Sequence, residues 1–328
     1  NTSTSKVAVI KKSERPGIDV DYEFGQVDVN QPIVGKTMNC GNISSAVGPF
    51  AIDEGLVKAV EPVTEAHIFN TNTQKEIIAR VPVKDGRAVT EGDFAIDGVP
   101  GTAAKVTLKF VAPQGAASGK LLPTGKVKDT IEIEGKVYEY SFVDAANPVI
   151  FVHPEDFGVT GTEIPSQFNA LPNCGEICRI LEIIRGTGAV TLGFAKDLED
   201  ARINSQTLPK IAFATKPADY TAGSGKAIAA GDVDLVGRLF SVGMKMIDAY
   251  MAICTVTAAN TPGTIVNEIA KQSLGTDRIM HLRIGHPWGI MDAYADLKVE
   301  EDGTHTVLSG NLDRTARRIM EGYVYVRD

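Results

Sequence analysis

The segment GNISSAVGPFAIDEGLVKAV, residues 41–60, differs in pattern from the sequence on either side of it. Apolar and small residues recur in it at helical spacing and surround nearly the whole circumference, which predicts a helix buried on most sides. The flanking segments form short strand-like runs rich in Val and Ile, bounded by Gly, Asp and Asn. These predicted strands are Val7–Ile10, Val20–Val29, His67–Asn70, Glu76–Val83 and Val106–Val111. The sequence therefore predicts strands that wrap around a central helix.

The same plan starts again after a short flexible segment. Pro113–Gly119 has small, uncharged residues without apolar periodicity, so we interpret it as a linker between two halves. Beyond it, helices are predicted near Cys174–Arg185 and in the apolar segment AICTVTAANTPGTIVNEIA, residues 252–270. The remaining predicted elements are strands at Thr130–Ile133, Val137–Val143, Val149–Val152, Lys210–Ala214, Asp232–Val242, Arg278–Ile284 and Ala293–Val299, with a short helix and a strand over Arg314–Val326. The weak similarity of the halves indicates a duplicated α+β fold.

Composition and charge exclude several classes of protein. Of the 328 residues, 43% are hydrophobic and 23% are charged, which excludes a disordered, collagen-like or coiled-coil chain. Because 33 Lys and Arg stand against 41 Asp and Glu, the net charge is −8, and we expect neither a nucleic-acid partner nor an anionic membrane. No apolar run reaches the roughly 18 residues of a membrane span.

Cysteine usage and the first residues give two further expectations. The four cysteines are few and scattered, so we expect a reducing cytoplasm rather than a disulfide framework. The chain begins with Asn1 rather than Met and enters a strand almost at once, so we expect that its front is truncated.

The segment Met38-Asn-Cys-Gly-Asn42 is the sharpest chemical feature of the sequence. It stands where a strand region turns into the predicted buried helix, and N–H groups at a helix start favour anions and thiolates. The alternative is that Cys40 is a small buried residue. At the front, Ser3-Thr-Ser-Lys6 brings three hydroxyls and an ammonium before an apolar strand, or else forms a solvated terminus.

These segments carry a resemblance to a known family. Together with Thr4–Ile10 and Asn39–Ile52, the matching motifs are Asp19–Tyr22, Gln26-Val27, Asp97–Gly101, Leu121–Gly125, Ala146–Pro148, Ile284–Pro287 and Arg314–Arg317. In this order, over the whole chain, they resemble the PrpF family of isomerases, relatives of diaminopimelate epimerase. The resemblance implies a diaminopimelate epimerase-like α+β fold with two pseudo-symmetric halves, each a central helix wrapped by a curved, mostly antiparallel sheet.

The resemblance also implies boundaries and a reaction. Residues 1–116 with 315–328 would form the first half and residues 117–314 the second, with the active site in the cleft between them. The family isomerises small unsaturated di- and tricarboxylates without a cofactor, and 3-methylitaconate is the substrate we expect first. Alternatives are 2-methylaconitate and 4-oxalomesaconate, or, from another class, a carboxylate-binding protein without activity. The sequence leaves a homo-oligomer open.

The family's catalytic lysine and cysteine correspond to Lys6 and Cys40. Moving a C=C bond requires a proton to leave one carbon and another to be added two carbons away, while donors hold a carboxylate whose charge grows. We expect Lys6 and Cys40 to share the proton transfers, with the order left open. The Gly41 and Asn42 N–H groups and the Ser44 hydroxyl would hold a carboxylate. Ordinary pKa values of about 10.4 for Lys and about 8.5 for Cys require tuning for this work.

Weaker candidates for substrate binding surround these two. Ser5 and Asn39 belong to the two motifs, and Asn147 in Ala-Asn-Pro either contacts substrate or forms an Asx turn. Asn72 and Thr73, with Asn70, either line the cleft or form a polar hairpin turn. The remaining candidate is His286, in a Gly-His-Pro loop followed by the only tryptophan, Trp288. Arg314 and Arg317 either pair with substrate carboxylates or contact acidic side chains of the fold, and we expect the contact with the fold.

Metal and nucleotide sites are not expected. Cys174 and Cys178 lie four apart on a predicted helix, but no second ligand pair stands at zinc spacing. Cys254 is expected in the core. The segment Ala222–Lys226 lacks the first glycine and the strand-to-helix context of a phosphate-binding loop, so we interpret it as a surface loop.

Overall fold

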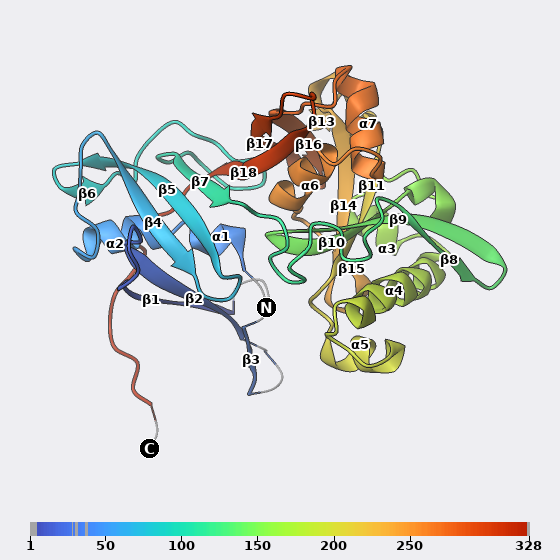
Figure 1. Ribbon diagram of the computed structural model, residues 1–328, viewed down its shortest axis with the longest axis horizontal. Helices are drawn as coiled ribbons and strands as arrows, with labels where there is room; N and C mark the ends of the chain where they lie inside the picture. The colour runs from blue at the N-terminus through green and yellow to red at the C-terminus, as the bar shows by residue number, and fades with distance from the viewer. Residues whose placement is uncertain (1–4, 28, 30–31, 37–38, 327–328) are drawn as a thin grey trace.

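The computed structural model describes residues 5–27, 29, 32–36 and 39–326 (Figure 1). A 16-stranded mixed sheet runs through both halves in the order β1-β2-β4-β5-β7-β18-β17-β16-β14-β11-β10-β9-β8, with β3, β6 and β15 paired beside it. Most neighbours are antiparallel, and the pairs β2·β4, β10·β11 and β14·β16 are parallel. The predicted α+β class is confirmed.

The first half consists of a curved sheet and two short helices. In β7, every second residue is buried and the residues between are half-buried, the alternation expected of a sheet with one covered face. The strands of this half are β1 (Lys6–Lys12), β2 (Val20–Val27), β3 (Val34–Gly35), β4 (Val63–Asn70), β5 (Lys75–Lys84), β6 (Arg87–Ala88) and β7 (Val106–Val111). The helices are α1 (Gly41–Ser44) and α2 (Val47–Asp53).

The single helix predicted over residues 41–60 is wrong in its length. The Ser44 hydroxyl donates to the Cys40 carbonyl and the Ser45 hydroxyl donates to the Asn42 carbonyl, so side chains compete with the backbone where α1 ends. The second helix, α2, stops before Gly55, which has a φ of +69°. Between these ends, α2 buries Val47, Ala51 and Ile52 against the sheet as predicted.

The second half packs helices on both faces of its part of the sheet. Its strands are β8 (Asp129–Ile133), β9 (Lys136–Ala145), β10 (Asn147–Val152), β11 (Lys210–Thr215), β14 (Leu235–Ser241), β15 (Lys245–Ile247), β16 (His281–His286), β17 (Gly289–Val299) and β18 (His305–Arg314), with a separate hairpin of β12 (Tyr220–Thr221) and β13 (Ala227–Ile228). The helices are α3 (Pro165–Asn169), α4 (Cys174–Thr191), α5 (Leu198–Asn204), α6 (Ala252–Ala259) and α7 (Ile265–Leu274). The segment Ala222–Lys226 lies in the turn of the hairpin.

Alternate residues of β10 show how these layers form. Val149 and Phe151 belong to the core that contains α6 and α7, whereas Ile150 and Val152 belong to the core beneath α4. The strand is buried along its whole length for this reason. The predicted helix over residues 252–270 is divided in two, because Gly263 has a φ of +88° and Thr264 caps α7 by accepting from the Asn267 N–H.

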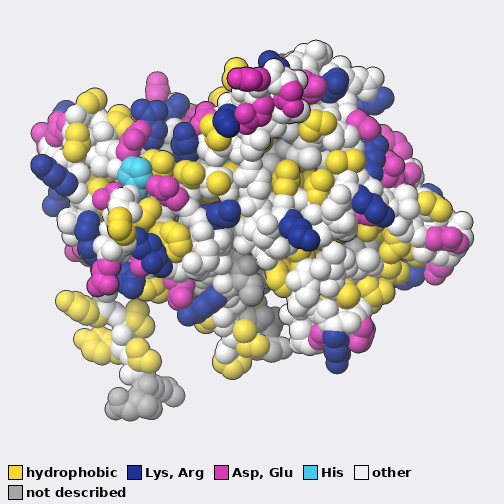
Figure 2. Space-filling model, in the orientation of Figure 1, with side chains coloured by type: hydrophobic (Ala, Val, Ile, Leu, Met, Phe, Trp, Pro, Cys, Tyr) yellow, Lys and Arg dark blue, Asp and Glu magenta, His cyan; other side chains and the backbone are white. Residues whose placement is uncertain are grey.

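The end of the chain differs from the prediction. No strand was predicted over residues 305–314, yet β18 forms there and pairs with β17 on one side and with β7 of the first half on the other. The short helix and strand predicted over Arg314–Val326 are wrong, because residues 315–326 form neither. Apolar side chains of this segment, from Ile319 to Val326, project into solvent (Figure 2). The loop over residues 113–119 separates β7 from β8, and we propose it as the boundary of the halves.

Candidate active site

Lys6 and Cys40 meet although they are far apart in the sequence. Lys6 opens β1, where it lies opposite Gln26 of β2, and Cys40 is the residue before α1. The Lys6 Nζ lies 3.4 Å from the Cys40 Sγ and donates a hydrogen bond to it. The structure therefore brings together the two residues expected to share proton transfer. Ser3, Thr4 and Met38, which belong to the same two motifs, lie outside the described residues.

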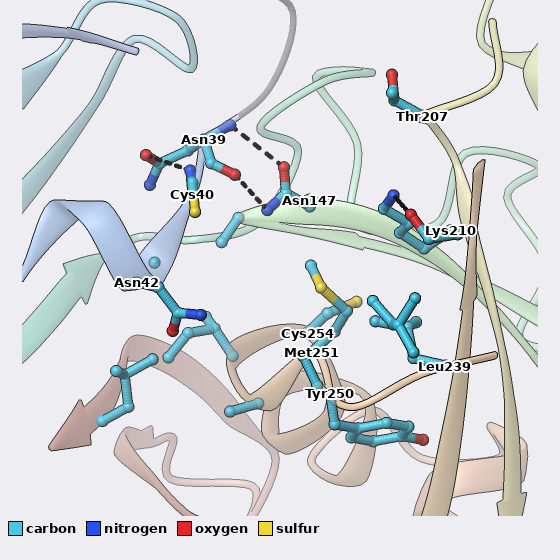
Figure 3. A pocket seen from close by; sticks show the side chains of 18 of the residues that line it. Asn39, Cys40, Asn42, Asn147, Thr207, Lys210, Leu239, Tyr250, Met251 and Cys254 are labelled. Carbon is cyan, nitrogen blue, oxygen red and sulfur yellow. Dashed lines mark hydrogen bonds between the residues drawn. The ribbon is translucent and has the colours of Figure 1, made fainter. Parts of the chain in front are cut away.

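Asn39 and Asn147 fix the position of this thiol. The Asn39 Oδ1 accepts from the Cys40 N–H at 2.8 Å and from the Ser44 hydroxyl at 3.1 Å. Asn147, from the second half, donates through its Nδ2 to the Asn39 carbonyl at 3.2 Å, and its Oδ1 accepts from the Asn39 N–H at 3.4 Å (Figure 3). Both asparagines are at most 7% exposed. The turn that presents Cys40 is thus held from both halves.

A cavity of about 210 Å³ lies beside this turn, lined by residues of both halves. Its charge contrasts with that of the acidic chain, because Lys6, Lys210 and Arg314 line it and no Asp or Glu does among the described residues. Asn39, Gly41, Asn42 and Asn147 supply polar groups, and the N–H groups of Gly41 and Asn42 lie in a first helical turn, where no intrahelical acceptor reaches them. This arrangement suits a small anion.

Lys210 and Arg314 were not predicted as site residues. Lys210 is 7% exposed and donates to the Ser241 hydroxyl at 2.8 Å. The pKa of Lys210 is lowered to about 8, chiefly by burial and also by the charges of Arg185 and Lys6, which outweigh the opposite effect of Cys40. Arg314, whose pKa burial also lowers, donates through Nε to the Asn42 Oδ1 at 3.2 Å. Arg314 was expected to contact an acidic side chain of the fold, but it lines the cavity.

Apolar side chains form much of the rest of the wall. Tyr250, Met251 and Cys254 lie together on the floor of the cavity in Figure 3, with Leu239 beside them. Cys254 is 1% exposed, which confirms its predicted place in the core, and burial raises the pKa of its thiol. A wall of this kind accommodates hydrocarbon between charged ends.

Five predicted residues, Ser5, Ser44, Asn72, Thr73 and His286, are not among those that line the cavity. The Ser44 hydroxyl donates to Asn39 and to the Cys40 carbonyl behind the turn, and Ser5 accepts from the Val27 N–H through its carbonyl. The Asn72 side chain accepts from the Phe24 N–H at 2.8 Å, and Thr73 donates to the Asn70 Oδ1. Asn70, Asn72 and Thr73 thus form the turn between β4 and β5, which was the alternative interpretation of that segment.

His286 lines a second cavity, of about 770 Å³, rather than the first. It is 3% exposed, and its Nδ1 accepts from the Trp288 N–H at 3.4 Å. Burial, with a contribution from Arg238, lowers the pKa of His286 to about 4, so the ring is neutral at pH 7. The second cavity meets the first at Asn42, Tyr250 and Arg314.

Metal ligation finds no support in the part of the chain that the structure describes. No group of three His, Cys, Asp or Glu side chains is placed to hold an ion there. Cys178 donates to the Met244 carbonyl at 3.4 Å, and burial and the neighbouring Cys174 raise the pKa of its thiol to about 12. Over the same residues, no helix has the length and hydropathy needed to cross a membrane.

Sequence reasoning missed Lys210 and Ser241 for a shared reason. Lys210 stands at the head of a predicted apolar strand, where a lysine normally extends to solvent. Its burial depends on the pairing of β11 with β14, which carries Ser241. A charged residue directly before the run Ile211–Thr215 was the one available signal.

Comparison with known proteins identifies the family to which this chain belongs. The chain is 46% identical over 326 residues to the 3-methylitaconate isomerase of Eubacterium barkeri, covering 98% of this chain and 83% of that protein. It is 39% identical over 336 residues to the 2-methyl-aconitate isomerase of Shewanella oneidensis, covering 99% and 82%. A crystal structure of methylitaconate-delta-isomerase superposes with a TM-score of 0.83 at 45% identity, covering 99% of this chain and 82% of that one. The family model described as PrpF protein matches residues 1–327, and the chain therefore belongs to the PrpF family.

Proposed function

We propose that this protein is an isomerase that moves the C=C bond of a small unsaturated dicarboxylate, with 3-methylitaconate as the substrate, and that it works without a cofactor in the cytoplasm. The observation that carries the proposal is the contact between Lys6 and Cys40 in a cavity with three cationic and no acidic side chains among the described residues. The similarity to 3-methylitaconate isomerase supports this choice of substrate, since it exceeds that to 2-methyl-aconitate isomerase.

The reaction requires one proton to leave and one to arrive. In 3-methylitaconate, the C–H bond at the carbon that bears the methyl group breaks, and its electron pair becomes the new C=C bond. The electron pair of the old bond takes up a proton at the methylene carbon, which becomes a second methyl group. The product is a dimethylbutenedioate, and no oxidant or reductant is consumed.

We propose that Lys6 and Cys40 share these two proton transfers. A thiol and an amine joined by one hydrogen bond can exchange a proton between them, so the pair can accept one from substrate and return one. As carbon loses its proton, negative charge spreads into the adjacent carboxylate. The Gly41 and Asn42 N–H groups and the Arg314 guanidinium lie where they would hold that carboxylate.

Proton NMR in D₂O with 3-methylitaconate tests the proposal. We expect the two methylene signals to disappear while new methyl signals grow, and deuterium to enter the product where the shared proton exchanges with solvent. Parallel samples with 2-methylaconitate and 4-oxalomesaconate test the alternatives. Binding of all three acids without any moved C=C bond would replace the isomerase with a carboxylate-binding protein.

A further inference from the structure

Lys210 is a buried cation that the proton transfer leaves without a role. It enters the cavity from β11 of the second half, and Figure 3 shows it across the cavity from Cys40. An ammonium has three N–H donors, and in the described structure Lys210 uses one of them, toward the Ser241 hydroxyl at 2.8 Å. Two donors are therefore left for a ligand in the cavity.

No acidic side chain compensates this charge. Among the described residues Lys210 takes part in no ion pair, although it is only 7% exposed. The charges that act on Lys210 are mostly positive, since Arg185 and Lys6 both lower its pKa. A buried cation without a counter-ion destabilises the empty protein, whereas an anion bound beside it removes that cost.

The other two cationic side chains of the cavity contact the segment around α1. Lys6 donates to the Cys40 Sγ at 3.4 Å, and Arg314 donates to the Asn42 Oδ1 at 3.2 Å. The rest of the lining includes hydrocarbon, with Leu239, Met251 and Ile253 among it, and the uncharged polar residues Asn147, Thr207 and Ser241. A ligand with charge at both ends and methylated carbon in the middle matches this distribution.

We propose that Lys210, oriented by Ser241, binds the second carboxylate of the substrate, while the first carboxylate and the reacting carbons lie beside Lys6 and Cys40. The choice of a dicarboxylate as the ligand rests on the proposed function. It makes the cavity selective for acids with two carboxylates on a short chain, since one charge must reach each half. Lys210 is thus a residue that determines specificity.

Binding of an unreactive acid tests this assignment separately from catalysis. The probes are 2,3-dimethylsuccinate, which has no C=C bond to move, and its monomethyl ester, which lacks one charge. By titration calorimetry we expect the wild-type chain to bind the diacid at least about 10-fold more tightly than the half-ester. In Lys210→Met the diacid should bind no better than the half-ester, and Lys210→Arg should recover part of the difference.

Two controls separate a lost ligand contact from a lost fold. Lys216→Met changes an exposed lysine just beyond the same strand and should leave the affinity ratio unchanged. Lys210→Met should melt no lower than wild type, because it removes a buried charge. The proposal would be overturned if Lys210→Met still bound the diacid about 10-fold more tightly than the half-ester, or if the wild-type chain bound the two equally well. A Lys210-dependent ratio without turnover of methylitaconate would overturn the isomerase function alone.

Discussion

The hydrogen bond from Lys6 to Cys40 joins two groups that are separately poor catalysts at neutral pH. The ordinary pKa of a lysine leaves little free amine, and that of a cysteine leaves little thiolate. In contact, one group of the pair can take a proton from substrate while the other returns one. The pair, rather than either residue, is the unit that we expect mutation to destroy.

We therefore predict that Lys6→Met and Cys40→Ser each lower kcat for 3-methylitaconate by about 10² to 10⁴-fold, the usual range for loss of acid–base catalysis. Lys11→Met is the matched control, because Lys11 lies on the same strand with a side chain that is 74% exposed. NMR of the initial rate measures all three. If both cavity variants stay folded and keep near-full turnover, the assignment of the pair is wrong.

His286 gives a prediction on stability rather than on turnover. Its pKa falls from about 6.5 in an unfolded chain to about 4 in the folded one. Between these values the unfolded state binds more protons, so the free energy of unfolding decreases as the pH falls from about 6.5 to about 4. The loss is on the order of a few kcal/mol, and it is absent above pH 7. Urea unfolding at several pH values should show a smaller decrease in His286→Gln, and an identical decrease would exclude His286 as its source.

Among the helices, α2 depends on a glycine for its distance from the sheet. A Cβ on Gly48 would lie 2.8 Å from the Ala79 Cβ and 3.0 Å from the Val81 Cγ2, both on β5. The Ala79 Cβ cannot move without shifting the strand. The close approach of α2 also sets the position of α1 and the Cys40 turn, since the two helices are separated only by Ser45 and Ala46.

We predict that Gly48→Ala destabilises the protein by about 1–3 kcal/mol, the usual cost of overpacking a core. Chemical unfolding measures the change. Ala46→Ser is the control, because Ala46 is exposed at the N-cap of α2, where serine is favoured. Equal stability of Gly48→Ala and wild type would show that the helix has room to retreat from the sheet.

Prediction from sequence succeeded where local pattern decides the structure. The bounds of β7 agree with the predicted strand, because alternate residues face the core and solvent in turn. The helix predicted over residues 41–60 was too long. The apolar spacing that predicted it continues past the Ser44 hydroxyl and the left-handed Gly55, which end the two helices. Lys6 and Cys40 were predicted from sequence motifs. The position of Lys210 depends on the pairing of β11 with β10 and β14, strands that are far apart in the sequence, and no local pattern predicts that pairing.

Among the described residues, three of the places where the halves are joined lie well apart. The sheet continues from β7 into β18, and Asn39 and Asn147 exchange hydrogen bonds at the candidate active site. The third place is a loop of the first half, where the Asp97 carboxylate accepts from the Ile290 N–H at 2.8 Å and pairs with Lys226 at 2.9 Å. This loop covers Trp288, and both line the second cavity.

The contact at Asp97 can be followed with the only tryptophan. A Cβ on Gly98 would lie 2.9 Å from the Trp288 Cβ, so loop and ring are packed without space between them. We predict that Asp97→Ala frees the loop, shifts the Trp288 emission to longer wavelength and increases its quenching by acrylamide. Asp93→Ala, which changes an exposed residue of the same loop, should do neither. Unchanged emission in Asp97→Ala would mean that packing alone holds the loop. In that case Gly98→Ala, which forces a side chain against the ring, should cause the shift that the lost carboxylate did not.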